Sequence, residues 1–326
     1  MMKKYLYKLE RIVLKIIRKL IPHSQHKGND TYLMSGKELN KLIYKAISGE
    51  KPYMIARFGS VEFESGAYPY ILSRPIKERY NLFFKRRVSY LHKDEQYENG
   101  LIVPLCNNAG FFPKNPSLIP AFSKLMQEDV SILDCCCTCD WIDYDLFAPL
   151  YKQDIQFAKL EDMEPYDYDK PWSKALEKKR VLVVHPFVKS IRSQYEKREL
   201  IWENENVLPE FELITIRAVQ TMAGEKAPFA NWFEALEYMK KQMDEIEYDV
   251  AIIGCGAYGF HLAAHAKRTG HKAIHLGGAT QILFGIKGKR WEQIPEVSKF
   301  FNEHWVNPLP EETPMHKDNV EGGCYW

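Results

Sequence analysis

Short apolar runs alternate with amphipathic segments along most of the chain, and this alternation limits the fold more than any other feature. The runs are four or five residues long, and several of them end in glycine or polar residues. Strands that alternate with helices form a mostly parallel sheet with helices on both faces. We therefore predict an α/β, Rossmann-like fold. The predicted strands are residues 53–56, 101–105, 130–133, 181–184, 213–216, 250–253 and 273–276.

The length of 326 residues suits about two domains, or two halves of one large unit. We expect an amphipathic helix over residues 1–22, an N-terminal half over 23–175 that begins with a polar linker, and a nucleotide-binding C-terminal half over 176–326. Ligands of parallel sheets bind beyond the carboxyl ends of the strands. The loops after the predicted strands are therefore the places to look for a site.

The N-terminal segment combines an apolar stripe at helical spacing with seven Lys or Arg residues and one acidic residue, Glu10. Pro22 ends the predicted helix. The N-terminal segment has no unbroken apolar stretch of the kind that a secretory signal requires. A basic amphipathic helix suits an anionic membrane surface, so we expect a cytoplasmic protein held peripherally on the inner face of a bacterial membrane. The alternative is a helix packed on the protein's own core.

Charge and cysteine content exclude some classes of protein. Lys and Arg number 45 and Asp and Glu 43, so the net charge is +2, without the basic excess typical of nucleic-acid binding. Seven cysteines cannot all pair, which favours a reducing cytoplasm. Cys136 and Cys139 form a C-x-x-C pair, but Asp140 and Asp143 are poor partners for zinc. We expect a buried strand and a cysteine-rich turn there, without a metal.

Residues 254–259 match G-x-G-x-x-G between a predicted strand and a predicted helix. Such a turn places backbone amides and the positive end of a helix dipole near a phosphate. A dinucleotide site also needs an acidic residue at the end of the next strand, where this chain has Gly277 and Gly278. We therefore favour a nucleoside diphosphate over NAD, with a ligand-free turn as the alternative. The residues expected to bind are Gly254, Gly256, Ala257, Tyr258 and Gly259.

Two further loops add candidate donors to the phosphate site. Gly277 and Gly278 expose backbone amides, and Lys289, in a basic turn with Lys287 and Arg290, can neutralise a diphosphate. His185 ends another strand, where it is either a group that titrates near neutral pH or a structural hydrogen-bonding residue. Ser193 follows in the next helix.

The loop after the first strand contains Arg57, Gly59, Ser60 and Glu62. If a helix begins after Gly59, its dipole lowers the pKa of Glu62 and favours an ionised carboxylate that acts as a base or binds sugar hydroxyls. Arg57 can bind a phosphate through two parallel hydrogen bonds or orient Glu62. By the residues alone, a surface ion pair at a helix start explains this loop better than catalysis does.

The segment Arg57-Phe-Gly-Ser-Val-Glu62 resembles the R-x-G-x-x-E signature of bacterial glycosyltransferases with the GT-D-type fold. Further segments resemble that family in the same order over about residues 30 to 326. They are residues 108–112, 185–187, 193–199, 218–221, 254–259, 275–278 and 320–326. The resemblance implies transfer of a sugar from a nucleotide-activated donor to a growing surface glycan, often on a lipid carrier.

One position departs from the family pattern. Better-known members carry R-x-G-D-G-E, whose two carboxylates are linked to a divalent metal, and this chain has Ser60 in place of the Asp. Mn²⁺ or Mg²⁺ requires several oxygen ligands. We therefore expect weak or absent metal dependence, with Arg57 and backbone donors neutralising the diphosphate and Glu62 acting as the base.

The leading hypothesis is a glycosyltransferase that uses a nucleotide sugar, with UDP as the expected nucleotide, and a glycan or lipid-linked acceptor. Two alternatives remain open. One is an NAD(P)-dependent oxidoreductase or epimerase that binds its cofactor at residues 254–259. The other is a non-catalytic nucleotide-sugar-binding protein of a capsule assembly.

Overall fold

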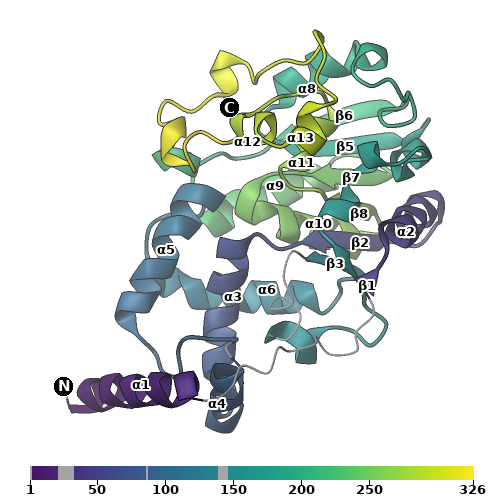
Figure 1. The fold of residues 1–326 in the computed structure, drawn as a ribbon. Coiled ribbons are helices and arrows are strands. Elements are labelled where there is room, and N and C mark those ends of the chain that lie inside the picture. The colour runs from purple at the N-terminus through teal and green to yellow at the C-terminus, as the bar shows by residue number, and fades with distance from the viewer. Residues whose placement is uncertain (1, 21–32, 86, 139–145) are drawn as a thin grey trace.

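Eight parallel strands form one sheet at the centre of the molecule (Figure 1). The structure is a computed structural model and describes residues 2–20, 33–85, 87–138 and 146–326. The sheet confirms the predicted α/β class. Across the sheet the strands are β1 (Leu33–Met34), β4 (Gln156–Lys159), β3 (Cys135–Thr138), β2 (Tyr53–Arg57), β8 (Lys272–His275), β7 (Val250–Ile253), β5 (Arg180–His185) and β6 (Glu212–Arg217).

Helices cover both faces of this sheet (Figure 1). The longer ones are α1 (Met2–Leu20), α2 (Gly36–Ser48), α3 (Ser60–Ser73), α4 (Ile76–Phe84), α5 (Glu95–Ala109), α6 (Ile119–Val130), α8 (Val188–Tyr195), α9 (Trp232–Asp244) and α10 (Gly259–Arg268). Three short ones follow: α11 (Ala279–Leu283), α12 (Lys289–Glu292) and α13 (Pro295–Ser298). None of the helices within the described ranges combines the length and the apolar character needed to cross a membrane.

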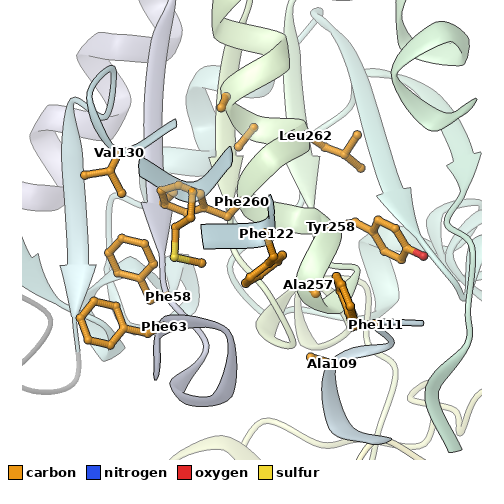
Figure 2. Packing of buried hydrophobic residues seen from close by; sticks show 14 of the residues in the cluster. Phe58, Phe63, Ala109, Phe111, Phe122, Val130, Ala257, Tyr258, Phe260 and Leu262 are labelled. Carbon is orange, nitrogen blue, oxygen red and sulfur yellow. The ribbon is translucent and has the colours of Figure 1, made fainter. Parts of the chain in front are cut away.

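Alternate strand residues supply two separate apolar layers, because successive side chains of a strand point to opposite faces. In β2, Met54 and Ala56 join the layer under α3, α5, α6, α9 and α10, whereas Ile55 joins the layer under α2, α8 and α11. Aromatic rings dominate the first layer, as Figure 2 shows for Phe122 and Phe260. This layer fixes the starts of α3 and α10 against each other, since Phe58 stacks on Phe260 at a centroid distance of 4.7 Å.

The N-terminal and C-terminal strands meet in the middle of the sheet. Strands β1 to β4 lie on one side and β5 to β8 on the other, and Ile55 of β2 lies opposite Ile274 of β8. The carboxyl ends of β2, β8, β7 and β5 therefore lie next to one another at one edge. The division into units 23–175 and 176–326 stays a prediction.

Two of the predicted strands are wrong. Residues 101–105 lie inside α5, where Leu101, Ile102 and Leu105 turn one buried face to the core at helical spacing. Local capping favours the helix: the Asp94 carboxylate accepts hydrogen bonds from two amides of the first turn, and Gly110 ends the helix in the left-handed conformation. Short apolar runs fit either structure, and the caps decide between them.

The second wrong strand is residues 130–133, where α6 ends; the strand β3 begins five residues later at Cys135. Cys135, Cys136 and Cys137 are buried in this strand rather than part of a turn. The predicted linker at residues 23–32, together with Cys139, Asp140 and Asp143, lies outside the described residues. Within the described chain, no group of three or more His, Cys, Asp or Glu residues is placed to hold a metal ion.

Candidate active site

The loops after β2, β5, β7 and β8 line one cavity at the carboxyl edge of the sheet. The structure thus brings the Arg57–Glu62 loop together with the glycine turns that lie about two hundred residues further along the chain. The predicted residues in the lining are Arg57, Gly59, Ser60, Glu62, His185, Gly254, Gly256, Tyr258, Gly277 and Gly278.

Four other predicted residues lie outside this lining. Ser193 is exposed on α8. Ala257 and Gly259 are buried and do not line the cavity. Lys289 of α12 donates a hydrogen bond from Nζ to the Gly322 carbonyl at 3.0 Å. Tyr258 lines the cavity, but its ring stacks on Trp232 at 5.0 Å within the core, so that face of the ring is not open to a ligand.

Glu62 lies in the first turn of α3, and its carboxylate folds back over Gly59, the residue that precedes the helix. A Cβ atom placed on Gly59 would lie 2.0 Å from Oε2 of Glu62. That distance is far inside van der Waals contact, so this position of the carboxylate requires glycine at residue 59.

Burial raises the pKa of Glu62 above its ordinary value, against the opposing effects of a hydrogen bond to its own backbone and the positive charges of Arg57 and His261. The expected lowering by the helix dipole is therefore wrong, because desolvation of the carboxylate outweighs it. The side chain keeps some accessible surface toward the cavity. A half-buried carboxylate with a raised pKa is a stronger base than an exposed one, which suits proton transfer near neutral pH.

Arg57 is the last residue of β2, and its guanidinium lies against Gly277. A Cβ atom on Gly277 would lie 3.3 Å from Nη1 of Arg57, and Gly277 has a φ of 66°, so both space and backbone conformation favour glycine there. His275 Nδ1 donates a hydrogen bond to the Arg57 carbonyl at 3.0 Å, which fixes the end of the strand. Among the described residues Arg57 forms no ion pair, so its charge is available to an anion in the cavity.

His185, at the end of β5, is buried and neutral. Burial lowers the pKa of His185 to about 3, which excludes the expected titration near neutral pH. The Phe187 amide donates a hydrogen bond to Nδ1 at 3.0 Å. Nδ1 is therefore an acceptor, and the ring proton resides on Nε2. The side chain thus offers one fixed N–H donor, as a structural hydrogen-bonding residue does.

The sequence predicts two glycine turns whose backbone amides are free to bind a phosphate, and the structure differs from this prediction. The amide of Gly254 donates to the Val184 carbonyl at 3.0 Å, and that of Gly277 donates to the Ile253 carbonyl at 3.0 Å. The amides of Cys255 and Gly256 form no hydrogen bond within the described part of the chain. Cys255 precedes and Gly256 begins the single turn Gly256–Tyr258, which continues into α10, so both amides lie at the positive end of a helix dipole.

The C-terminal tail closes one side of the cavity. Glu321, Tyr325 and Trp326 line it together with Arg290. Arg290 forms an ion pair with Glu321, and its guanidinium lies 5.0 Å from the centre of the Tyr325 ring. An anion that enters the cavity meets Arg290 already paired with a half-exposed carboxylate. Within the basic turn, Arg290 rather than Lys289 therefore supplies positive charge to the cavity.

The carboxylates that line the cavity do not suit a divalent metal. Glu62 and Glu321 are the two acidic residues of the lining, and Glu321 is already paired with Arg290. Ser60 offers only a hydroxyl where the family pattern has a second carboxylate. A hard cation needs several oxygen ligands with negative charge, so we derive no step through a metal.

Adding a methyl group at residue 59 gives a direct test of the Glu62 geometry. The Gly59→Ala variant is expected to stay folded, because residue 59 faces the cavity, but to lose at least about tenfold in activity, since the Glu62 carboxylate has to move. The measurement is the catalysed rate beside a circular dichroism spectrum. Gly100→Ala, where the new Cβ meets nothing within 4 Å, is the control. Unchanged activity in Gly59→Ala would contradict the geometry.

Comparison of the sequence with known protein families finds no match, and comparison with curated proteins finds none either. Among solved structures, the chain is similar to a selenomethionine-substituted "domain of unknown function 1792", with 11% identity over 80% of this chain and 99% of that chain, and a TM-score of 0.37. Similarity of that degree carries no argument about activity, which depends on the site itself.

Proposed function

We propose that this chain is a glycosyltransferase that moves a sugar from a nucleotide-sugar donor to a hydroxyl group of a cell-surface glycan or a lipid-linked acceptor. The observation that supports it most is the meeting of three features in one cavity: the carboxylate of Glu62 with its raised pKa, the guanidinium of Arg57, which forms no ion pair with any described residue, and a helix start. One group suits proton removal, and the others suit a departing diphosphate.

Three kinds of group in the cavity are available to bind the diphosphate of the nucleotide sugar. Arg57 supplies a positive charge without an ion-pair partner among the described residues, and the helix start at Gly256 supplies amides. The buried His185 supplies a neutral N–H at Nε2. Arg290 adds a second charge if the phosphates displace Glu321 from it. Preorganised donors of this kind stabilise the negative charge that grows on a leaving group.

Glu62 serves as the general base in this proposal. Its carboxylate takes the proton of the acceptor hydroxyl, the acceptor oxygen forms a bond to the anomeric carbon of the sugar, and the bond between that carbon and the phosphate oxygen breaks. The nucleoside diphosphate leaves with the electron pair of that bond. The atoms and electrons of this step balance without a metal ion or a redox cofactor.

Nucleotide binding is testable without knowing the sugar. We expect UDP at about a hundred times its dissociation constant to stabilise the protein by about 2.7 kcal/mol in a thermal-shift measurement, with no such effect of NAD. The Arg57→Ala variant should lose this stabilisation. Arg217→Ala should keep it, because Arg217 also ends a strand but lies outside the cavity lining. Stabilisation by NAD alone would favour the oxidoreductase, and stabilisation by neither nucleotide would contradict the proposal.

A further inference from the structure

Helix α1 turns polar side chains toward the rest of the protein. The Glu10 carboxylate contacts His92 Nε2 at 2.9 Å and accepts a hydrogen bond from the Tyr80 hydroxyl. One turn below, Leu14 packs against the edge of the core. The Tyr7 ring stacks on His92 with a centroid distance of 3.9 Å. These contacts hold the helix on the protein by one narrow face.

Arg18 extends the same face by two turns. Its Nη1 donates to the carbonyls of Phe83 and Val88, each at 3.3 Å, and its guanidinium lies 4.4 Å from the centre of the Phe83 ring. Residues 10, 14 and 18 are spaced by four, so they share one side of the helix. The alternative drawn from the sequence, a helix packed on the protein's own core, thus describes only this narrow face, because the apolar stripe does not make these contacts.

The apolar side of α1 faces outward. Its large apolar side chains are between 40% and 78% exposed, which is unusual for a contiguous group of this size. At 100° per residue they cover a sector about 140° wide, as in helices that bury one face. The members of this apolar sector are Leu6, Leu9, Ile12, Val13, Ile16, Ile17 and Leu20.

Positive charge borders the apolar sector. Lys15 and Lys19 lie on one flank of it, four residues apart on the same side of the helix. The one acidic residue of the helix, Glu10, is already bound to His92 and Tyr80. The outward surface of α1 therefore joins apolar side chains to cations without a compensating anion.

We propose that α1 is a docking surface for an anionic lipid bilayer. The apolar sector enters the boundary between headgroups and acyl chains, and the lysines contact the anionic headgroups. A second copy of the chain fits less well, because two such helices packed face to face would bring their cationic flanks together. This inference goes beyond the proposed function and holds whether or not the cavity transfers sugars.

The contacts of α1 also fix how the cavity faces the bilayer. Helix α3 begins at the cavity and ends at Ser73, and α4, which follows, carries the Tyr80 and Phe83 contacts to α1 (Figure 1). Fourteen residues at about 1.5 Å each separate the two ends of α3 by about 20 Å. Docking through α1 therefore places the lipid near the end of α3 that lies away from the cavity. If the proposed function is correct, the acceptor hydroxyl has to project from the membrane to reach the cavity.

The experiment measures sedimentation of the full chain with vesicles of phosphatidylcholine alone and with one third phosphatidylglycerol. We expect binding to the anionic vesicles that weakens as salt rises. The Lys15→Gln/Lys19→Gln variant should bind about 30-fold more weakly, at about 1 kcal/mol for each lysine. The Leu9→Gln/Ile16→Gln variant should lose at least about tenfold. Leu200→Gln/Met315→Gln, which alters exposed apolar residues elsewhere, should bind as the unchanged chain does.

Three results would overturn the proposal: no binding to anionic vesicles, equal binding to both kinds of vesicle, or dimers in light scattering that separate when Leu9 and Ile16 are changed. The last result would identify a second copy as the partner. The thermal shift with UDP, measured on the same variants, reports on the cavity alone, so a failure of docking is distinguishable from a failure of the proposed function.

Discussion

Replacing Glu62 by Gln is expected to lower the rate of sugar transfer by at least about 10²-fold, which is the loss typical of a missing general base. The amide keeps the shape of the side chain but cannot accept the acceptor's proton. Because the substitution also removes a half-buried carboxylate whose pKa is raised by burial, the fold should not be weakened. The measurement is kcat with the thermal-shift response to UDP, which the variant should retain.

The pH dependence of kcat tests the same role of Glu62 as the general base. Glu62 acts as a base only when ionised, so kcat should fall as the pH drops through its raised pKa, at a pH above its ordinary value of 4.5. The Glu62→Gln variant should lose this acid limb. Glu64→Gln is the matched control, because Glu64 is exposed on the same helix and contacts Tyr97 instead of the cavity. Full activity in Glu62→Gln would contradict the role of Glu62 as the base.

Five predicted strands were found because each is a buried apolar run that leads to a glycine or polar turn, as in residues 250–253. The two wrong strands had runs of the same length and composition. Their true structure depends on groups outside the run: the Asp94 cap and Gly110 make residues 101–105 helical. At the other site, the Asp134 carboxylate accepts a hydrogen bond from the Met54 amide at 2.7 Å and starts β3 beside β2. Such contacts between distant residues are invisible in a local pattern.

The candidate site was likewise predictable from the sequence only in part. Arg57, Glu62 and the glycine turns stand at strand ends, so the rule for parallel sheets placed them at one edge. The direction of the Glu62 pKa could not be predicted, because it depends on how many atoms of other segments surround the carboxylate. Arg290 was singled out only as part of a basic turn, and the Tyr325 and Trp326 lining rested on the resemblance, because the tail has no periodic pattern that points to the cavity.

A buried charge cluster beside the site governs stability. Asp129, at the end of α6, is fully buried; its carboxylate contacts His261 Nδ1 at 2.6 Å and forms an ion pair with Arg268. Both partners belong to α10, whose first residues carry the helix start at the cavity. The cluster therefore ties α10 to α6.

Replacing Asp129 by Ala is expected to lower the free energy of unfolding by about 3–5 kcal/mol, because it leaves the buried His261 ring without its hydrogen-bond partner and Arg268 without its ion pair. Urea denaturation followed by circular dichroism measures the change. Asp244→Ala supplies the control: Asp244 pairs with His265 of the same helix at 2.7 Å, but it is half-exposed, so its loss should cost less than about 1 kcal/mol. Equal costs for the two variants would contradict the role of burial. A double variant with Arg268→Ala should cost less than the sum of the single changes, because both remove one interaction.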